Sequence, residues 1–465
     1  MPFRPSSTPP PVKFDPVCGI LNKDDGSEMM YHGMFMNVVD DQGNEFFTFC
    51  LITSDRELYT FESEDLEKLK ARPRVVPNPE AWIFENRWSV KGIVSYLNGI
   101  DPNPPPDSVL DMLMNTYKGY LELRRKMDYM LLSLWTIGTY MQPIWYSYPY
   151  LLIIGPMRSG KSKILELLEQ TAYNPIKAES ITESAMFRTI DALAPTILID
   201  ESDFTDPDKN SAIQRLLLVG YKKGNKALRS ERTKSEKIVA RAYLTFSPKA
   251  IVAPRGVQEM IYDRCIVIQM LRGRDPKIVN NWPRPDDPKW QDLRDHLYHF
   301  SLTKWKEVRE AYESISGEEV GLSSRDLELW KPMLSIAKVF GVYDEVLDYA
   351  RGKTEEKNRE LLTEMNEVKL LRCLLHMAKE QVYDKYVSAA TISEKLKDLY
   401  GDERWMKAQN IGRIMTHTLG FRNRPLKVIR RGVAVYKLDE EYLRDLAERY
   451  GIDPNRPLGE DEEEQ

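Results

Sequence analysis

Residues 151–162 read LLIIGPMRSGKS, and this stretch decides the fold. The apolar run Leu151–Ile154 predicts a buried strand, and a helix is expected to begin near Lys161. Between them, Gly155 and Gly160 allow tight turns that expose backbone N–H groups toward a helix N-terminus. Such a loop suits the oxygens of a triphosphate, because many donors can approach them without clashes. The spacing GxxxxGKS in this context therefore predicts a P-loop.

The P-loop assigns a role to each of its residues. Lys161 is expected to reach the β- and γ-phosphates of ATP, and the Ser162 hydroxyl is expected to ligate Mg²⁺. The other residues that we expect to contact the nucleotide are Gly155, Pro156, Met157, Arg158, Ser159 and Gly160. A chance match in an unrelated loop is the alternative, and the strand before and the helix after the motif argue against it.

A second apolar run, Pro195–Glu201 (PTILIDE), reads as a buried parallel strand that ends in two acids. Asp200 is placed to hold the magnesium ion through water, and Glu201 to polarise the attacking water molecule. The alternative is an acidic cap on a helix that follows the strand. Because a P-loop requires an acidic partner, the sequence favours ATP hydrolysis over nucleotide binding alone.

Length and composition limit the number of domains and exclude several classes of protein. The 465 residues, 42% of them apolar and 29% charged, suffice for about two to four domains and are too apolar for general disorder. No apolar run approaches the roughly 20 residues of a membrane-spanning helix, and the Pro-rich start lacks the apolar core of a secretory signal. Four scattered cysteines without CxxC spacing predict neither a zinc site nor a disulfide framework, in keeping with a reducing cytoplasm. His296 and His299 suit structural or surface roles.

The pattern along the chain predicts an α/β protein in four segments. They are a small β-containing module with a Pro-rich linker (1–105), an ATPase core with a helical lid (106–345), a winged helix-turn-helix (346–455) and an acidic tail (456–465). A hairpin around Asp41–Asn44 and a further strand are expected in the first segment. The core should hold a mostly parallel sheet, with later strands at Thr196–Ile199, Tyr243–Phe246 and Cys265–Gln269.

Five stretches of the core carry a resemblance to a known family. They are residues 135–168 (WTIGTYMQPIWYSYPYLLIIGPMRSGKSKILELL), 194–203 (APTILIDESD), 220–229 (GYKKGNKALR), 246–253 (FSPKAIVA) and 260–268 (MIYDRCIVI). Together they resemble the AAA+ helicase-like proteins of archaeal plasmids and viruses. Those proteins are similar in turn to minichromosome maintenance helicases and to the helicase parts of primase-helicases. The resemblance covers about residues 108–340, and the C-terminal segment more loosely.

The resemblance implies further roles around the nucleotide. Arg264, in the Asp263-Arg264 pair, corresponds to an arginine finger that reaches the γ-phosphate of a neighbouring subunit; from the residues alone, a surface salt bridge is the alternative. Arg325, in SSRDLE, corresponds to the arginine of the lid that senses nucleotide. Thr245 and Ser247 fall where the first polar sensor belongs, with Lys249 as a substitute.

Positive charge gathers between Lys222 and Arg241, where eight basic and two acidic residues give +6 in a chain of net charge −5. Similar helicases insert a β-hairpin into the ring channel at this place, so a grip on the DNA backbone is implied. The expected contacts are Lys226, Arg229, Arg232, Lys234 and Lys237. A solvated surface is the alternative.

The C-terminal winged helix is expected to use Trp405–Leu419 as its recognition helix and a basic wing that includes Arg430 and Arg431. Duplex DNA binding and protein contacts both remain open for it. As a whole, the sequence predicts an ATP-driven DNA helicase or translocase, a homo-oligomer expected to be hexameric, in the replication of a mobile element. The alternative is an initiator or loader that binds DNA and remodels partners without unwinding. A small-molecule P-loop kinase is disfavoured by the basic segment and Arg264.

Overall fold

The protein is described here by a computed structural model that covers most of the chain. The described residues are 12–23, 25–61, 71–84, 87–177, 183–200, 211–232, 238–253, 256–322, 324–364, 366–380, 386–403, 405–422, 425–450 and 452–455. The chain forms two compact units, Met1–Arg351 and Gly352–Gln465. The expected acidic tail, 456–465, lies outside the described residues.

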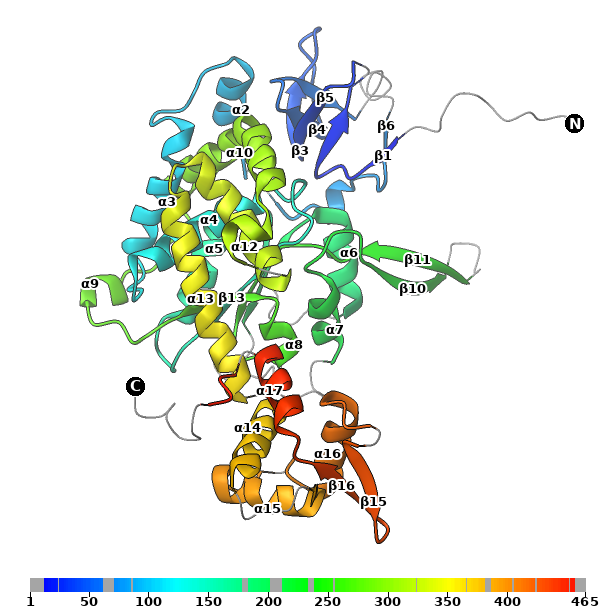
Figure 1. The fold of residues 1–465 in the computed structure, drawn as a ribbon. Coiled ribbons are helices and arrows are strands. Elements are labelled where there is room, and N and C mark those ends of the chain that lie inside the picture. Colours follow the sequence, from blue (N-terminus) through cyan, green and yellow to red (C-terminus); the bar gives the residue numbers. More distant parts are fainter. Residues whose placement is uncertain are drawn as a thin grey trace, which may run out of the picture. The chain divides into compact units, whose positions relative to one another are not determined.

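A five-stranded parallel sheet lies at the centre of the first unit (Figure 1). Its strands, in spatial order, are β13 (Cys265–Gln269), β7 (Tyr150–Ile154), β12 (Lys249–Val252), β9 (Thr196–Asp200) and β8 (Pro175–Lys177). Alternate residues of β7 enter different cores: Leu151 and Ile153 belong to one apolar cluster, and Tyr150 and Leu152 to another. The sheet is thus buried on both faces, as the apolar runs predict.

Helices cover both faces of this sheet. α5 (Lys161–Thr171) contributes to the core on one face, while α6 (Glu183–Leu193) and α7 (Ser211–Val219) contribute to the core on the other. α4 (Lys126–Thr139) is buried all round, which explains its lack of a polar face. The other helices of this unit are α2 (Val90–Leu97), α3 (Val109–Lys118), α8 (Glu259–Tyr262), α9 (Pro276–Val279), α10 (Lys289–Ser314), α11 (Gly317–Val320), α12 (Ser324–Val339) and α13 (Tyr343–Glu364), the last of which runs on into the second unit.

The N-terminal strands form a four-stranded antiparallel sheet, β2 (Cys18–Asn22), β3 (Glu28–Val39), β4 (Glu45–Thr53) and β5 (Leu58–Thr60). The expected hairpin is present: β3 pairs with β4, and the Asp40 carboxylate accepts the N–H groups of Gln42 and Asn44 in the turn. Beside this sheet, β1 (Val12–Phe14) pairs in parallel with β6 (Ala71–Pro73).

The second half of the first predicted segment, where a Pro-rich linker was expected, contributes buried residues to the folded unit. Trp88, Ile93 and Tyr96 are buried in the large cluster that also contains α4 and α10, because the many prolines of this segment are interrupted by apolar residues. Val17 and Met30 of the N-terminal sheet enter the same cluster. The N-terminal sheet and the central sheet therefore share one core.

One predicted strand of the central sheet is wrong. Tyr243 and Leu244 end β11 (Ile238–Leu244), which pairs antiparallel with β10 (Lys226–Arg232) in a hairpin that projects from the body (Figure 1). The strand between β7 and β9 is β12, which begins after Pro248. Both segments are rich in β-forming residues, so composition alone did not distinguish them. The hairpin itself lies in the basic segment, where the resemblance to helicases implies one.

The second unit has its own apolar core. Its elements after α13 are α14 (Asn366–Lys379), β14 (Tyr386–Ser388), α15 (Ala389–Tyr400), α16 (Ala408–Arg413), a π-helical turn (Ile414–Thr418), β15 (Lys427–Arg430), β16 (Val433–Lys437) and α17 (Glu440–Arg449). The strands form a three-stranded antiparallel sheet in the order β14-β16-β15. The segment around Arg430 and Arg431 is thus a two-stranded ribbon, β15–β16, to which β14 adds a third strand.

The thiols of all four cysteines of the sequence are buried: Cys18, Cys50, Cys265 and Cys373. Within the described ranges, no group of histidine, cysteine and acidic side chains is arranged to hold a metal ion. No helix in that part of the chain is long and apolar enough to cross a bilayer.

Candidate functional site

The loop between β7 and α5 has the conformation that its glycines predict. Gly155 and Gly160 have φ angles of 151° and 84°, in the region that favours glycine. A Cβ on Gly155 would lie 2.4 Å from the carbonyl oxygen of Met270, so a larger residue cannot stand there without moving the backbone that follows β13. The loop delivers the chain to α5, whose first residue is Lys161.

The Lys161 side chain folds over this loop. Its Nζ donates hydrogen bonds to the carbonyl oxygens of Gly155, at 2.9 Å, and Pro156, at 2.6 Å. Burial lowers the pKa of Lys161, while the nearby Asp200 acts in the opposite direction. The ammonium is thus held inside the loop by two neutral acceptors, which the oxygens of a phosphate group are able to replace.

The loop also contains a buried polar atom in need of a partner. The Ser159 hydroxyl is buried, and no hydrogen-bond partner is found for it among the described residues. Such a group is costly to bury unless a ligand or water satisfies it. This feature fits a loop built to hold oxygen atoms of a ligand.

Ser162 and Asp200 meet at the carboxyl edge of the sheet. The Ser162 hydroxyl donates a hydrogen bond of 2.8 Å to the Asp200 carboxylate, although 38 residues separate them in the chain. Asp200 ends β9, and Ser162 lies in the first turn after the P-loop. A hydroxyl and a carboxylate are hard oxygen ligands, and the two together suit Mg²⁺ that also binds phosphate. Glu201 lies outside the described residues.

The far end of α5 is fixed by two arginines. Arg87 donates to the carbonyl of Ala172 at 2.7 Å, and Arg294 donates to that of Gln170 at 3.1 Å. Both cations face the C-terminal end of the helix, where the macrodipole favours positive charge. These contacts hold the helix that presents Lys161 and Ser162.

The residues expected to form the first sensor lie at the opposite edge of the sheet. In the parallel register, Ala250 of β12 pairs with Leu151 and Val252 with Ile153, so Thr245 and Ser247 precede the amino end of β12. Thr245 donates to the carbonyl of Asn225, and the Ser247 N–H donates to that of Gly220. The structure therefore does not bring these two residues to the P-loop, since the strand assigned to them belongs to the hairpin.

Lys249 lies at the same amino edge and is completely buried. Its Nζ donates to the carbonyl oxygens of Ser247, at 3.0 Å, Gly220, at 3.3 Å, and Thr245, at 3.4 Å. The ammonium also lies 5.0 Å from the centre of the Tyr150 ring. Burial lowers the pKa of Lys249 to about 7. Its contacts join the base of the hairpin to the sheet and do not reach the P-loop.

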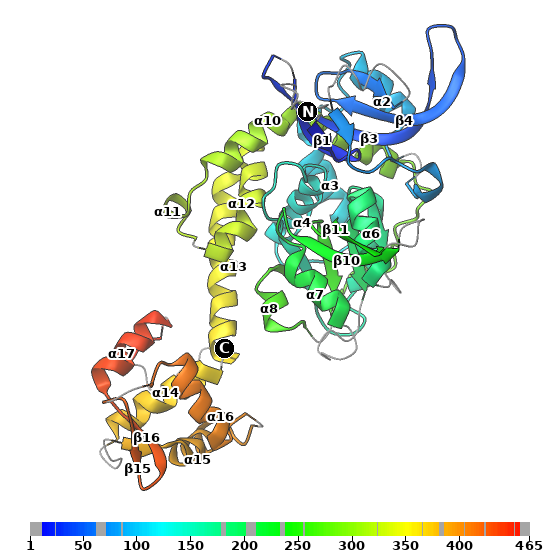
Figure 2. The same cartoon turned by 90° about the vertical axis from the view of Figure 1, so that its right-hand side faces the viewer.

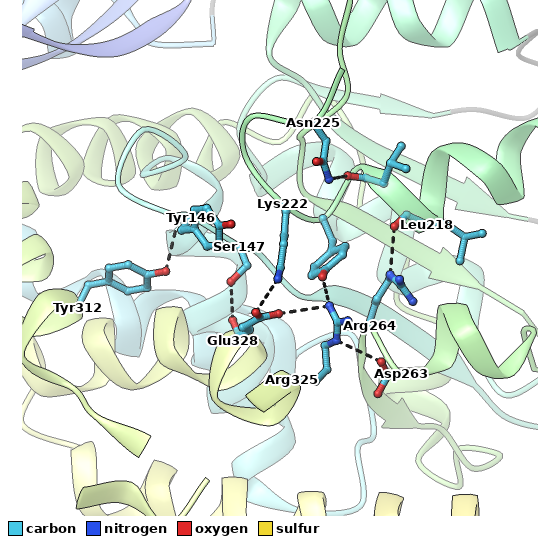
Figure 3. A network of polar contacts seen from close by, with 12 residues as sticks. Tyr146, Ser147, Leu218, Lys222, Asn225, Asp263, Arg264, Tyr312, Arg325 and Glu328 are labelled. Carbon is cyan, nitrogen blue, oxygen red and sulfur yellow. Dashed lines mark hydrogen bonds and ion pairs between the residues drawn. The ribbon is translucent and has the colours of Figure 1, made fainter. Parts of the chain in front are cut away.

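Arg264 and Arg325 lie together at this amino edge (Figure 3). Their guanidinium carbons lie 5.0 and 4.6 Å from the centre of one aromatic ring, that of Tyr221. Arg264 donates to the carbonyl of Leu218 at 3.2 Å, and Arg325 forms ion pairs with Asp263 at 3.1 Å and Glu328 at 3.2 Å. Both guanidinium groups are attracted to the Tyr221 ring, and their carbonyl and carboxylate partners hold them in place.

This cluster is separated from the chain's own P-loop by the length of the sheet. Cys265, directly after Arg264, pairs with Tyr150, the first residue of β7, whereas the P-loop follows the last residue, Ile154. Five residues of strand span roughly 16 Å. Arg325, expected to sense nucleotide from the lid, is therefore placed beside Arg264 and away from the P-loop of its own chain.

The hairpin β10–β11 carries the basic segment. Arg229 and Arg241 stand directly opposite each other on its two strands, a like-charge pair that disfavours pairing. Each guanidinium lies over an aromatic ring, Arg229 over Phe187 and Arg241 over Tyr243. Lys226 and Arg232 belong to β10, and Lys234 and Lys237 lie outside the described residues.

The base of the hairpin is anchored to α6 and to the N-terminal strands. Both views place β11 beside α6 (Figures 1 and 2). The Asp191 carboxylate of α6 accepts the N–H of Leu244 and binds the Arg74 guanidinium, both at 2.8 Å. Arg74 also pairs with Asp15 at 2.5 Å. No local sequence pattern predicted this network of polar contacts, because its residues are far apart in the chain.

In the second unit, Arg430 and Arg431 form one end of the β15–β16 hairpin. Arg431 and Gly432 have φ angles of 49° and 80° and make the two-residue turn between the strands. Arg430 lies over the Tyr386 ring at 4.4 Å. Arg430 and Arg431, which were expected in a basic wing, thus lie at an exposed ribbon tip beside an exposed apolar residue, Ile429.

The fold and the loop define a mixed α/β protein with a parallel sheet and a P-loop at its carboxyl edge. No model of a known protein family matches the sequence, and no curated protein sequence does either.

Among solved structures, the chain is similar to the active helicase Cch of SCCmec type IV, with 10% identity, a TM-score of 0.41 and coverage of 93% of this chain and 94% of that one. It is also similar to the C-terminal region of NrS-1, with 10% identity, a TM-score of 0.32 and coverage of 87% of this chain and 96% of that one. The similarity to the JCV helicase has 10% identity, a TM-score of 0.27 and coverage of 52% of this chain and 61% of that one. These TM-scores are below 0.5, so the likeness to these structures is loose.

Proposed function

We propose that this protein is an ATP-driven DNA helicase or translocase that works as a ring-forming oligomer of the AAA+ type, in the replication of a mobile element. The observation that carries the proposal is the division of the ATP machinery between two edges of one sheet. The P-loop, Ser162 and Asp200 lie at the carboxyl edge, and Arg264 lies at the amino edge. Arg264 cannot reach a nucleotide on its own P-loop, so its charge serves a neighbouring copy of the chain.

At the carboxyl edge, the chain binds ATP and positions it for hydrolysis. Lys161 exchanges its two carbonyl acceptors for the β- and γ-phosphates, and the loop N–H groups hold the remaining oxygens. Ser162 and Asp200 hold Mg²⁺, which neutralises charge that develops on the phosphates. Glu201 orients the attacking water and takes its proton. Arg264 of the neighbouring copy stabilises the charge on the departing γ-phosphate.

The DNA path is formed by the hairpins. In a ring, β10–β11 faces the channel, where its Lys and Arg residues contact phosphates of a single strand without reading its sequence. The fixed base at Asp191 and the Lys249 contacts connect the hairpin to β12, which lies between the P-loop strand and the acidic strand. In the second unit, which we propose to be a winged helix, Arg430 and Arg431 contact duplex DNA.

A loader that remodels partners without unwinding uses the same residues and remains the second candidate. The exposed hairpin favours the translocase, because Leu228, Ile238 and Val239 add exposed apolar side chains to its basic ones, a combination that suits contact with unpaired bases as well as phosphates. A small-molecule kinase has no use for such a hairpin.

Mixing two inactive variants tests the proposal. Lys161→Ala removes the charge that holds ATP, and Arg264→Ala removes the charge given to the neighbour, so each purified variant should hydrolyse ATP about 10³-fold more slowly than the wild type. In mixed rings, a Lys161→Ala subunit supplies Arg264 to an Arg264→Ala subunit with an intact P-loop. ATPase activity should therefore reappear on mixing, in proportion to such neighbours.

Two results would contradict this assignment. If the mixture stays as inactive as its components although pull-down of one affinity-tagged variant recovers the untagged one, Arg264 does not act between subunits. If Arg264→Ala alone keeps the wild-type rate, the arginine is only structural. Strand displacement from a forked DNA by the wild type then separates the helicase from the loader.

A further inference from the structure

The segment that follows β13, residues 270–282, runs along the P-loop and the first turn of α5, and we call it the strap. The carbonyl oxygen of Met270 faces Gly155. A Cβ placed on Gly160 would lie 3.7 Å from the terminal methyl group of the Met270 side chain. Arg272 donates to the carbonyl of Met157 at 3.3 Å. The strap therefore borders the P-loop on the β13 side, and the acidic strand β9 lies on the other side.

Lys163, two residues after the P-loop lysine, fastens the strap to α5. Its side chain is buried, and its Nζ donates to the carbonyls of Ile278 and Val279, at 3.0 and 2.9 Å, at the end of α9. The same ammonium lies 4.7 Å from the centre of the Trp282 ring. Glu122 holds the start of α9 by accepting the N–H groups of Arg274 and Asp275. These contacts fix Trp282 beside the first turn of the P-loop helix.

Trp282 is nevertheless largely open to solvent. Its exposed fraction is 57%, and Val279 and Leu271 on the same strap are also exposed. A large aromatic side chain that is fixed by a buried lysine, yet left exposed, is unusual for a residue whose only role is packing. The position of the strap beside the P-loop suggests what covers the ring.

The direction of a bound triphosphate follows from the order of the strands. Asp200 ends β9, and the Mg²⁺ and γ-phosphate end of the nucleotide must lie toward it, across β12 from the P-loop strand. The α-phosphate then lies at the end of the triphosphate that is farther from Asp200, on the β13 side of the P-loop. The nucleoside attached to it therefore leaves on the β13 side, where the strap and Trp282 are.

We propose that the strap is the nucleoside site, with the base of the bound nucleotide stacked on the Trp282 ring. This inference rests on the proposed function, because it requires a nucleotide in the P-loop. Stacking on an indole is open to every base, since each has a π-face. The site thus accepts nucleoside triphosphates in general, and purines, with their larger rings, gain most from it.

The test separates the base from the phosphates. Calorimetric titration of the full-length protein with the non-hydrolysable analogue AMP-PNP and with inorganic tripolyphosphate, both with Mg²⁺, compares wild type, Trp282→Ala, Trp282→Phe and Lys161→Ala. Phe47→Ala, which removes another exposed aromatic side chain far along the sequence, is the matched control. Trp282→Ala should weaken AMP-PNP binding roughly 5- to 100-fold and leave tripolyphosphate binding unchanged. Trp282→Phe, which keeps an aromatic face, should retain most of the affinity.

Other outcomes overturn the inference in distinguishable ways. If Trp282→Ala binds AMP-PNP as the wild type does while Lys161→Ala does not, the P-loop is correct and the base lies elsewhere. If Trp282→Ala weakens both ligands equally, the residue only supports the loop. If Lys161→Ala binds both ligands as the wild type does, the proposed nucleotide site itself fails, and the nucleoside site with it.

Discussion

At the scale of single residues, Lys249 is an uncommon choice for the start of a buried strand. Its ammonium is surrounded by three carbonyl oxygens and the Tyr150 ring, and burial lowers its pKa to about 7. In an unfolded chain the same group has its ordinary pKa of about 10.4. Between these two values, the unfolded chain binds a proton that the folded chain does not.

This difference predicts a pH dependence of stability. Because the unfolded state holds more protons between about pH 7 and 10, the free energy of unfolding should rise with pH in this range, by at most about 1.4 kcal/mol per unit from Lys249. Lys249→Met should lack this contribution. The measurement is the thermal midpoint of wild type and variant at pH 7, 8 and 9. If the difference between the two proteins does not change with pH, Lys249 stays charged when buried.

The sequence predicted the positions of residues that belong to a local motif. It did not predict the positions of residues whose contacts come from distant parts of the chain. The strand, glycine turns and helix start around Lys161 are local features, and the structure has them. Trp282 was missed because Lys163 and Ile278 are 115 residues apart, and a lysine on a helix normally points to solvent. From the sequence, Lys163 would be assigned to the exposed face of its helix, but the strap buries it.

At the scale of elements, the proposed role of the β10–β11 hairpin can be tested separately from that of the P-loop. Arg229→Ala together with Arg241→Ala removes the like-charge pair without touching the P-loop. Basal ATPase should survive, and affinity for single-stranded DNA should fall. The slope of log affinity against log salt should shrink by roughly 0.7 for each lost phosphate contact.

The matched control for this measurement is Lys91→Ala with Lys118→Ala, which removes the same charge from exposed helical positions. Fluorescence anisotropy with labelled single-stranded DNA across a salt series gives both slopes. Equal slopes for the two double variants would mean that the hairpin charge is only a solvated surface.

The hairpin also shows where prediction of elements failed. The β-forming segments on either side of Pro248 look alike, and sequence does not say which one pairs in parallel inside the core. Choosing the first, Tyr243–Phe246, placed Thr245 and Ser247 at the wrong edge of the sheet. The strand order in the structure shows that the second segment, Lys249–Val252, is the strand between β7 and β9.

At the scale of the whole molecule, the chain consists of two compact units, while four segments were expected from the sequence. A Pro-rich stretch suggested a linker before residue 105, but its apolar residues Trp88 and Ile93 belong to the large core. Proline content indicates an extended path and does not say whether that path is buried. The second unit, in contrast, holds a separate core.

These cores predict which parts fold alone. Residues 366–455, with their own buried cluster, should unfold in one cooperative transition when expressed separately. Residues 12–105 should not, because Val17, Met30 and Trp88 would lose the partners that bury them. Urea titrations followed by circular dichroism measure both fragments. A cooperative transition for 12–105 would show that the small cluster around Phe49 is sufficient for folding.

The four buried cysteines leave the surface of the protein free of native thiols. Burial also raises the pKa of Cys18 and Cys373 to about 12, so these side chains are almost never thiolates at neutral pH. A single cysteine introduced at an exposed position, such as Leu228→Cys on β10, should therefore take a maleimide dye alone, without prior removal of any native cysteine. The wild-type sequence is thus already a background in which a dye on the hairpin can be followed optically when ATP is added.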